Sequence, residues 1–210
     1  MQSSLAILVL NYNGRDLLEK CLCSIVAAAA SVPWGAAVVV VDNCSSDDSV
    51  AFVRSVFPSV EVVVSPRNDF LFSLNPIVAA RTEDIVVILN NDIWVTPGFL
   101  QPLIRHFDEG DLFAATCGIR DWDGTAFTAE SRPHICTVRP AGSWYEEIYE
   151  PAPDAPAEVQ LASGGASAYR RDRFVNLGGF DPLYRPGYSE DLDLSIRAWR
   201  QGWRIIYDPT

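Results

Sequence analysis

Three acidic side chains crowd the start of an amphipathic helical pattern in the stretch "YSEDLDLSIRAW". Glu190, Asp191 and Asp193 lie within four consecutive positions, beside apolar residues at helical spacing. Acids at a helix start interact favourably with the macrodipole, by about 0.3–1 kcal/mol each, but three neighbouring carboxylates also repel one another. The residues agree equally well with a purely stabilising role of the acids and with a division of labour among them. In a division of labour, one carboxylate is packed structurally and another is a general base that takes a proton from a hydroxyl.

A second acidic group closes the run "DIVVILNND", where Asp92 follows Asn90 and Asn91. A carboxylate exposed at a strand end suits Mg²⁺ or Mn²⁺, which bind carboxylate oxygens together with substrate phosphates. The same pattern is typical of a plain Asx-turn, and the residues alone leave both interpretations open. Asp42 closes "VVVVD" with a similar ambiguity, because it could cap the following helix or contact a nucleotide base.

The elements that must position these groups alternate between apolar runs and helical patterns. Strands are expected at 5–13, 37–41, 60–65 and 84–92. Helices are expected at 14–29 and 70–82, and a further helix is expected to run from an N-cap at Ser45 or Ser46 to Phe57. Continuous Val and Ile runs between helices predict a largely parallel sheet that is covered on both faces. Ligands bind such sheets beyond the carboxyl ends of the strands, which is where Asn11, Asp42 and the 90–92 segment fall.

The pattern changes after residue 110. The stretch "DLFAATCGIRDWDGTAF" predicts a strand and a hairpin around Asp123 and Gly124, and residues 132–157 are interpreted as a loop-rich insertion over the site. A strand and a short helix are expected in 162–182, followed by the acidic helix and a strand in "GWRIIYDP". Because the chain stops just after that strand, we expect a truncated domain.

Composition limits the function further. The chain has 210 residues, of which 49% are hydrophobic and 20% charged, so it can bury one sizeable core. A net charge of −11 argues against a nucleic-acid partner. Five scattered cysteines and two histidines indicate neither a disulfide framework nor a zinc site, and they favour a cytoplasmic location. The uncharged stretch 21–41 is interrupted by polar and turn-forming residues at 31–35, which predicts a helix end, a turn and a buried strand rather than a membrane span. No signal peptide is apparent.

Five segments, taken in order, resemble glycosyltransferase family 2 and especially its rhamnosyltransferase-like branch. They are "LVLNYNGRDLLEKCL", "VVVVDNCSSDDSV", "VVILNNDIWVTPGFL", "GGFDPLY" and "SEDLDLSIRAWRQGWRIIYDP". The resemblance covers nearly the whole chain except about 120–159. It implies an α/β fold of the GT-A type, with a mostly parallel central sheet flanked by helices, as a single domain over 1–210. Residues 1–110 would form the nucleotide-sugar-binding half and residues 111–210 the acceptor and catalytic half.

The resemblance also implies a reaction and its participants. The enzyme would be an inverting, hexosyl-type glycosyltransferase that uses a nucleotide-diphosphate sugar and a divalent cation, Mg²⁺ or Mn²⁺, in polysaccharide biosynthesis. Its acceptor would be a saccharide or a lipid-linked saccharide, and the enzyme could contact the inner face of a membrane peripherally.

The matching positions carry the implied roles. Donor-binding residues would be Asn11, Asn13, Asp42, Arg67, Asn68 and Asn91. Asp92 would hold the cation against the diphosphate, and Asp191 would be the catalytic base. Gly164 and Gly165 would lie on the acceptor side, where a missing Cβ lets a sugar approach the backbone. Glu190, also on the acceptor side, would support Asp191 or touch the acceptor. An acidic protein needs a cation, with local help from Arg67, to stabilise a leaving diphosphate.

The chain departs from the family pattern at two places. Phe70, Ser73 and Leu74 stand where small residues are usual, although Asn68 and Asn75 remain, and a downstream His- or Arg-containing segment near the diphosphate lies beyond the last residue. A non-catalytic nucleotide- or carbohydrate-binding module of the same fold is therefore an alternative.

Two other nucleotide-dependent enzyme classes fit less well. A sugar nucleotidyltransferase should have a glycine-rich loop with Arg or Lys after the first strand, whereas "NYNGRD" has one glycine. A dehydrogenase should show the GxGxxG pattern, which is missing here.

Overall fold

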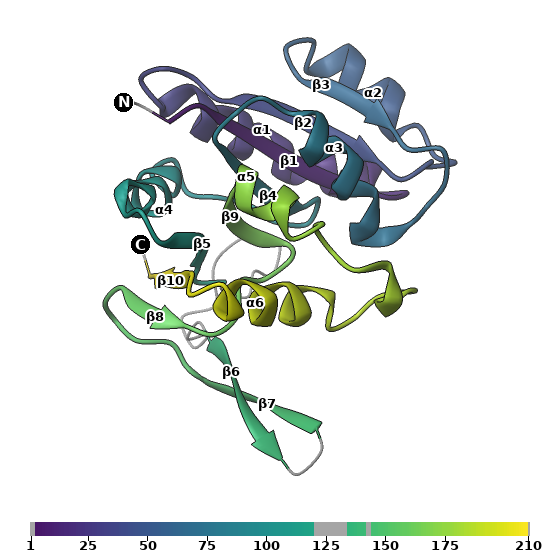
Figure 1. The fold of residues 1–210 in the computed structure, drawn as a ribbon. Coiled ribbons are helices and arrows are strands. Elements are labelled where there is room, and N and C mark those ends of the chain that lie inside the picture. Colours follow the sequence, from purple (N-terminus) through teal and green to yellow (C-terminus); the bar gives the residue numbers. More distant parts are fainter. Residues whose placement is uncertain (1–2, 120–133, 142–143, 210) are drawn as a thin grey trace.

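An eight-stranded sheet is the central element of the computed structural model, which describes residues 3–119, 134–141 and 144–209 (Figure 1). Its strands are β1 Leu5–Asn11, β2 Ala37–Asp42, β3 Glu61–Val64, β4 Ile85–Asn90, β5 Leu112–Cys117, β8 Ala157–Val159, β9 Ala166–Arg170 and β10 Arg204–Asp208. They lie in the order β3-β2-β1-β4-β9-β5-β10-β8. The four strands predicted in the first half are all present, each within a few residues of its predicted bounds.

The sheet is mostly parallel, as predicted. β1 pairs in parallel with β2 and β4, β2 with β3, and β5 with β10. β9 is antiparallel to both β4 and β5, and β8 is antiparallel to β10. β1, β4, β5 and β10 therefore point the same way, so their carboxyl ends lie along one edge of the sheet.

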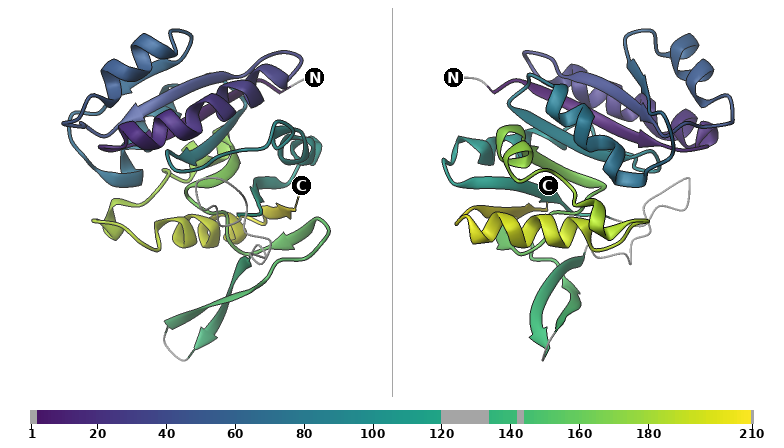
Figure 2. Two further views of the ribbon diagram at one scale, coloured as in Figure 1. Left: turned by 180° about the vertical axis from the view of Figure 1, so that it is seen from behind. Right: turned by 45° about the vertical axis from the view of Figure 1, so that its right-hand side comes forward.

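Helices cover both faces of this sheet (Figures 1 and 2). The α-helices are α1 Arg15–Ser31, α2 Ser49–Val56, α3 Leu74–Ala80, α4 Leu100–Arg105, α5 Arg171–Asn176 and α6 Glu190–Arg200, and the 3₁₀ helices are η1 Phe70–Ser73, η2 His106–Asp108 and η3 Pro182–Tyr184. One core packs α1 and α4 on the sheet through side chains such as Leu22 and Leu103. The other packs η1, α3, α5 and α6 through Phe72, Phe174 and Leu194.

The uncharged stretch near the start of the chain has the predicted form. α1 ends at Ser31, a turn follows, and β2 begins at Ala37. In the described part of the chain, every helix is too short or too polar to span a bilayer.

The predicted start of the second helix was wrong. α2 begins at Ser49, with Asp48 preceding it, rather than after Ser45 or Ser46. The Ser45 hydroxyl instead donates to Asp42 Oδ2 at 2.7 Å. The Ser46 N–H donates to Asn13 Oδ1 at 2.8 Å. Both serines join the loops after β1 and β2, so they are not available to cap the helix.

The prediction of a loop-rich insertion over 132–157 was also wrong. Its described part is an antiparallel hairpin of β6 His134–Ala141 and β7 Trp144–Pro151, followed by β8. The hairpin projects away from the eight-stranded sheet (Figures 1 and 2). Among the described residues, β6 and β7 pair only with each other, and prolines such as Pro140 and Pro151 are tolerated in such edge strands. The hairpin predicted around Asp123 and Gly124 lies outside the described residues.

Candidate active site

The last residues of three neighbouring strands meet at the carboxyl edge of the sheet. The register pairs Asn11 with Asp42, and Leu10 with Asn90. Asn11 and Asp42 are 0% and 1% exposed, whereas Asn90 and Asp92 are exposed to solvent. The structure therefore brings together the polar groups that the sequence placed at strand ends.

A hydrogen-bond network fixes Asn11 and Asp42. Asp42 Oδ2 accepts from Asn11 Nδ2 at 2.8 Å and from the Ser45 hydroxyl, and Asp42 Oδ1 accepts from the Ser45 N–H at 2.8 Å. Asn91 Nδ2 donates to Asn11 Oδ1 at 2.7 Å. Nucleoside contact by Asn11 and Asp42 stays a prediction, and in this structure both side chains hold the ends of β1, β2 and β4 together.

The other donor-side candidates lie on loops beside this network. Asn13 has a φ of 47°, and its N–H donates to the Ser45 hydroxyl at 2.8 Å, which joins the loops after β1 and β2. Asn68 Oδ1 accepts from the Phe70 N–H at 3.2 Å. The Arg67 side chain is 68% exposed, with Nη2 at 3.3 Å from Asp69 Oδ2. Arg67 is therefore accessible to an anionic ligand.

Gly164 and Gly165 connect the strand edge to Asp191. The Asn90 N–H donates to the Gly165 carbonyl at 2.9 Å, and the Gly164 N–H donates to Asp191 Oδ2 at 3.1 Å. A Cβ on Gly165 would lie 2.4 Å from Asn90 Nδ2, and one on Gly164 would lie 2.7 Å from Leu71 Cδ1. The missing Cβ atoms thus admit the protein's own side chains, and the approach of a sugar to these glycines stays a prediction.

Tyr169 supports the turn that contains these glycines. Its phenol donates to the carbonyls of Ala162 at 3.2 Å and Ser163 at 3.0 Å, and its side chain is fully buried. Burial, with a smaller contribution from the Asp191 carboxylate, raises the pKa of the Tyr169 phenol, so it remains a proton donor. Sequence reasoning missed Tyr169, because a single tyrosine inside a strand carries no pattern.

The three acids of α6 have different surroundings. Glu190 is 3% exposed, and its Oε2 has no hydrogen-bond partner among the described residues. Asp191 is half-buried, and its Oδ1 accepts from the Leu192 N–H at 2.8 Å. Asp193 Oδ2 pairs with Arg197 Nε at 2.7 Å, one helical turn away. These contacts support a division of labour, with Asp193 structural. Of the two predicted roles of Glu190, its burial favours support of Asp191 over contact with an acceptor.

Asp92 follows β4 by two residues and is exposed, and its predicted role as the ligand of a divalent cation stays a prediction. Burial and, to a smaller extent, the Asp92 carboxylate raise the pKa of the Cys21 thiol on α1 to about 11. Across residues 3–119, 134–141 and 144–209, no group of three His, Cys, Asp or Glu side chains could hold a metal alone. A single exposed carboxylate fits Mg²⁺ or Mn²⁺, which keeps water ligands and also takes phosphate oxygens.

The comparisons with known proteins identify the family. The sequence model of Glycosyl transferase family 2 matches residues 6–177, from β1 to the end of α5. The chain belongs to glycosyl transferase family 2. The resemblance found in the sequence is confirmed over this range.

Relatives of this family 2 chain differ in length. Polypeptide N-acetylgalactosaminyltransferase 15 of Mus musculus is 26% identical over 183 residues, which are 80% of this chain but 28% of that protein. The N-acetylglucosaminyl-diphospho-decaprenol L-rhamnosyltransferase of Mycobacterium tuberculosis is 26% identical over 237 residues, 100% of this chain and 75% of that protein. An uncharacterized glycosyltransferase of Mycobacterium bovis is 30% identical, over 87% of this chain and 76% of that protein. The rhamnosyltransferase-like resemblance is confirmed.

Solved structures confirm the GT-A fold. GalNAc-T7 with UDP, GalNAc and Mn²⁺ superposes with a TM-score of 0.78 at 15% identity, over 99% of this chain and 42% of that one. The mannosyltransferase PcManGT from Pyrobaculum calidifontis with GDP-Man and Mn²⁺ gives a TM-score of 0.69 at 18% identity, over 100% and 55%. The family 2 chain spans about half the length of these two structures.

Gly14 is a further site residue that the sequence did not reveal. A Cβ on Gly14 would lie 2.0 Å from Asn91 Nδ2 and 2.6 Å from Asn11 Oδ1, so Gly14→Ala should break the hydrogen bond between these amides. We expect the free energy of unfolding, measured in urea, to fall by about 1–3 kcal/mol, because the buried Asn11 amide loses a partner. Gly98→Ala is the control, since its Cβ would meet nothing within 4 Å. Equal losses in both variants would contradict this explanation.

Glu190 should make stability depend on pH. Burial, and to a smaller extent Asp191, raises the pKa of the Glu190 carboxyl. The folded protein therefore keeps this proton more strongly than the unfolded chain, and that stabilisation is complete below the ordinary pKa of about 4.3 and is lost as pH rises through the raised value. We expect Glu190→Gln to be more stable than the wild type at pH 8 and equally stable near pH 4, by urea denaturation.

The control for Glu190→Gln is Glu158→Gln, which alters an exposed carboxyl and should change little at either pH. A Glu190→Gln variant that is less stable at pH 8 would show that the charged carboxylate has a favourable partner.

Proposed function

We propose that this family 2 chain is the catalytic domain of an inverting glycosyltransferase, which moves a sugar from a nucleotide-diphosphate sugar to a hydroxyl of its acceptor. The observation that carries the proposal is the connection between Asn90 and Asp191. Asn90, at the end of β4, bonds to Gly165, and the adjacent Gly164 bonds to the Asp191 carboxylate. A carboxylate suited to proton abstraction is thereby attached to the strand edge where ligands of α/β sheets bind.

In this reaction, the acceptor oxygen attacks the anomeric carbon while the bond from that carbon to the diphosphate oxygen breaks. The hydroxyl proton moves to the Asp191 carboxylate. The N–H groups of Gly164 and Leu192 each contact one oxygen of this carboxylate, so its orientation is set before the substrate binds. Inversion at the anomeric carbon follows from attack on the face opposite the leaving group.

The leaving diphosphate needs positive charge in a chain with a net charge of −11. Asp92 would hold Mg²⁺ or Mn²⁺, with Asn90 and Asn91 beside it, and the cation would neutralise the phosphate oxygens when bound. The exposed guanidinium of Arg67 would add a second positive group. The Mn²⁺ and nucleotide ligands named for GalNAc-T7 and PcManGT support this assignment.

The name of the mycobacterial rhamnosyltransferase supports a lipid-linked saccharide as the acceptor. Such an acceptor would place the enzyme at a membrane face, in polysaccharide biosynthesis.

Calorimetric titration of UDP, GDP and dTDP with and without Mn²⁺, followed by assays of transfer and donor hydrolysis, tests the function. We expect one nucleotide to bind only with the metal, and turnover of its sugar conjugate to release the diphosphate. The anomeric configuration of the product, determined by NMR, tests inversion. Metal-dependent binding without turnover would instead favour the non-catalytic binding module, the alternative raised by Phe70 and Ser73. The proposal would be overturned if none of the three nucleotides bound.

A further inference from the structure

Two segments more than a hundred residues apart meet beside Asp191. Arg185 Nε lies 2.8 Å from Asp69 Oδ1, and Arg185 Nη2 lies 2.6 Å from Asp69 Oδ2, so the pair is bidentate. The guanidinium also lies over the Phe72 ring, 5.4 Å from its centre. We name these contacts between residues 69–72 and 185–187 the clasp.

The clasp includes a complementary fit of one large and one small residue. A Cβ on Gly187 would lie 2.8 Å from a carbon of the Phe70 ring, so the ring occupies the space that a larger residue at 187 would need. Phe70 has a φ of 52°, a left-handed backbone that glycine adopts more readily. The large residue that departs from the family pattern at position 70 is therefore in contact with the segment that leads to α6.

The clasp touches both supports of Asp191. On one side, Leu71 packs against Gly164, whose N–H donates to the Asp191 carboxylate. On the other side, the short link of Tyr188, Ser189 and Glu190 leads from Gly187 to Asp191. Tyr188 and Ser189 both have positive φ, at 78° and 68°, and such backbone persists only where the surrounding structure holds it.

We propose that Asp69 and Arg185 are a positioning pair for the transfer reaction, which keeps Asp191 in register with the donor side of the site. The proposal rests on the proposed function, because it takes Asp191 as the base. The Arg185 side chain is 44% exposed, and ion pairs of this exposure add little to stability. Arg67, the cation proposed for the diphosphate, shares the Asp69 carboxylate at 3.3 Å, so the clasp extends to the donor side.

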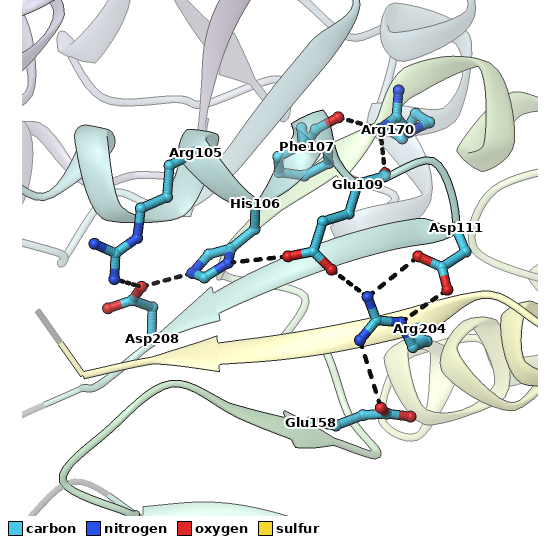
Figure 3. Close-up of polar contacts among 9 residues, drawn as sticks. All are labelled: Arg105, His106, Phe107, Glu109, Asp111, Glu158, Arg170, Arg204 and Asp208. Atoms are coloured by element: carbon cyan, nitrogen blue, oxygen red, sulfur yellow. Dashed lines mark hydrogen bonds and ion pairs between the residues drawn. The ribbon is translucent and has the colours of Figure 1, made fainter.

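Arg185→Ala tests the pair against Arg204→Ala. Arg204 is the control because it is also a solvent-accessible arginine that pairs with carboxylates, those of Glu109, Asp111 and Glu158, with Nε at 2.9 Å from Asp111 Oδ2 (Figure 3). It lies at the amino end of β10, which is the sheet edge opposite to the carboxyl ends. Arg204→Ala removes contacts with three carboxylates and Arg185→Ala with one, but only Arg185 borders the proposed site.

Two measurements follow from the proposal. Hydrogen exchange at residues 163–165 and 187–195 should become faster in Arg185→Ala and stay unchanged in Arg204→Ala. Arg185→Ala should also lower kcat by about 10- to 100-fold, as expected when a base is displaced by about 1 Å, with little change in nucleotide affinity. Asp69→Ala should lower kcat to the same extent, and the double variant should lower it no further, because both residues act on Asp191 through one contact. A change of nucleotide affinity in Asp69→Ala alone would reflect the second partner of Asp69, Arg67.

The conservative variant separates positioning from general disruption. Arg185→Lys keeps the charge but not the bidentate geometry, so it should recover only part of the kcat. Unchanged exchange and unchanged kcat in Arg185→Ala would overturn the positioning pair while leaving the proposed function intact. If the wild type has no transferase activity, the proposed function fails, and the positioning role fails with it. Faster exchange in Arg185→Ala would then show only that the clasp orders these segments.

Discussion

Asp191→Asn is expected to lower kcat by about 10²- to 10⁴-fold, which is the usual contribution of a general base. The amide has nearly the same shape as the carboxylate, and its oxygen can still accept the Gly164 N–H. It cannot take a proton from the acceptor hydroxyl. Affinity for the nucleotide in the presence of Mn²⁺ should remain unchanged, because the proposed donor contacts lie at the ends of β1, β2 and β4 and on the loop after β3. Initial rates and calorimetric titration measure the two quantities separately.

The control for this variant lies on the same helix. Asp193→Asn removes a carboxylate two residues away whose partner is Arg197 at 2.7 Å. Such a pair within a helix is worth about 0.3–0.5 kcal/mol, so stability should fall slightly and kcat should not change. A similar loss of kcat in both variants would mean that the total charge of the helix start matters, and not the position of Asp191.

The elements that present the site could be predicted because their signals are local. The Val and Ile runs ending at Asn11, Asp42 and Asn90 identify buried parallel strands, and parallel strands bring such ends to one edge. The place of Ser45 was also within reach, because it follows Asp42 by three residues, a spacing typical of polar turns. A helix cap, which was predicted for Ser45, is an equally local alternative for this residue.

The remaining features depend on contacts between distant residues. The space at Gly14 is filled by Asn91, and the space at Gly165 is filled by Asn90, partners that are more than seventy residues away in each case. No pattern within either loop reveals which side chain will arrive there. The hairpin of β6 and β7 was missed for a different reason, since its proline and aromatic residues obscure the alternation that marks a strand.

Asp92→Ala is expected to remove the metal-dependent part of nucleotide binding. Asp92 is the exposed carboxylate at the end of β4, so its loss leaves Asn90 and Asn91, whose uncharged amides bind Mg²⁺ or Mn²⁺ more weakly. Affinity measured with Mn²⁺ should fall to the metal-free value, a loss of at least about tenfold or about 1.4 kcal/mol. Calorimetric titration of the nucleotide diphosphate at several Mn²⁺ concentrations measures this change without any turnover.

The control is Asp48→Ala, which removes an exposed carboxylate from the neighbouring loop after β2. If the negative field of the site alone attracts the cation, both variants should weaken binding alike, whereas coordination by Asp92 predicts that only Asp92→Ala does so. Asp191→Asn completes the comparison. If the two carboxylates have separate tasks, Asp191→Asn should bind the nucleotide without reacting, and Asp92→Ala should fail to bind it. Equal losses of nucleotide affinity in the two variants would contradict the separation of metal binding from proton abstraction.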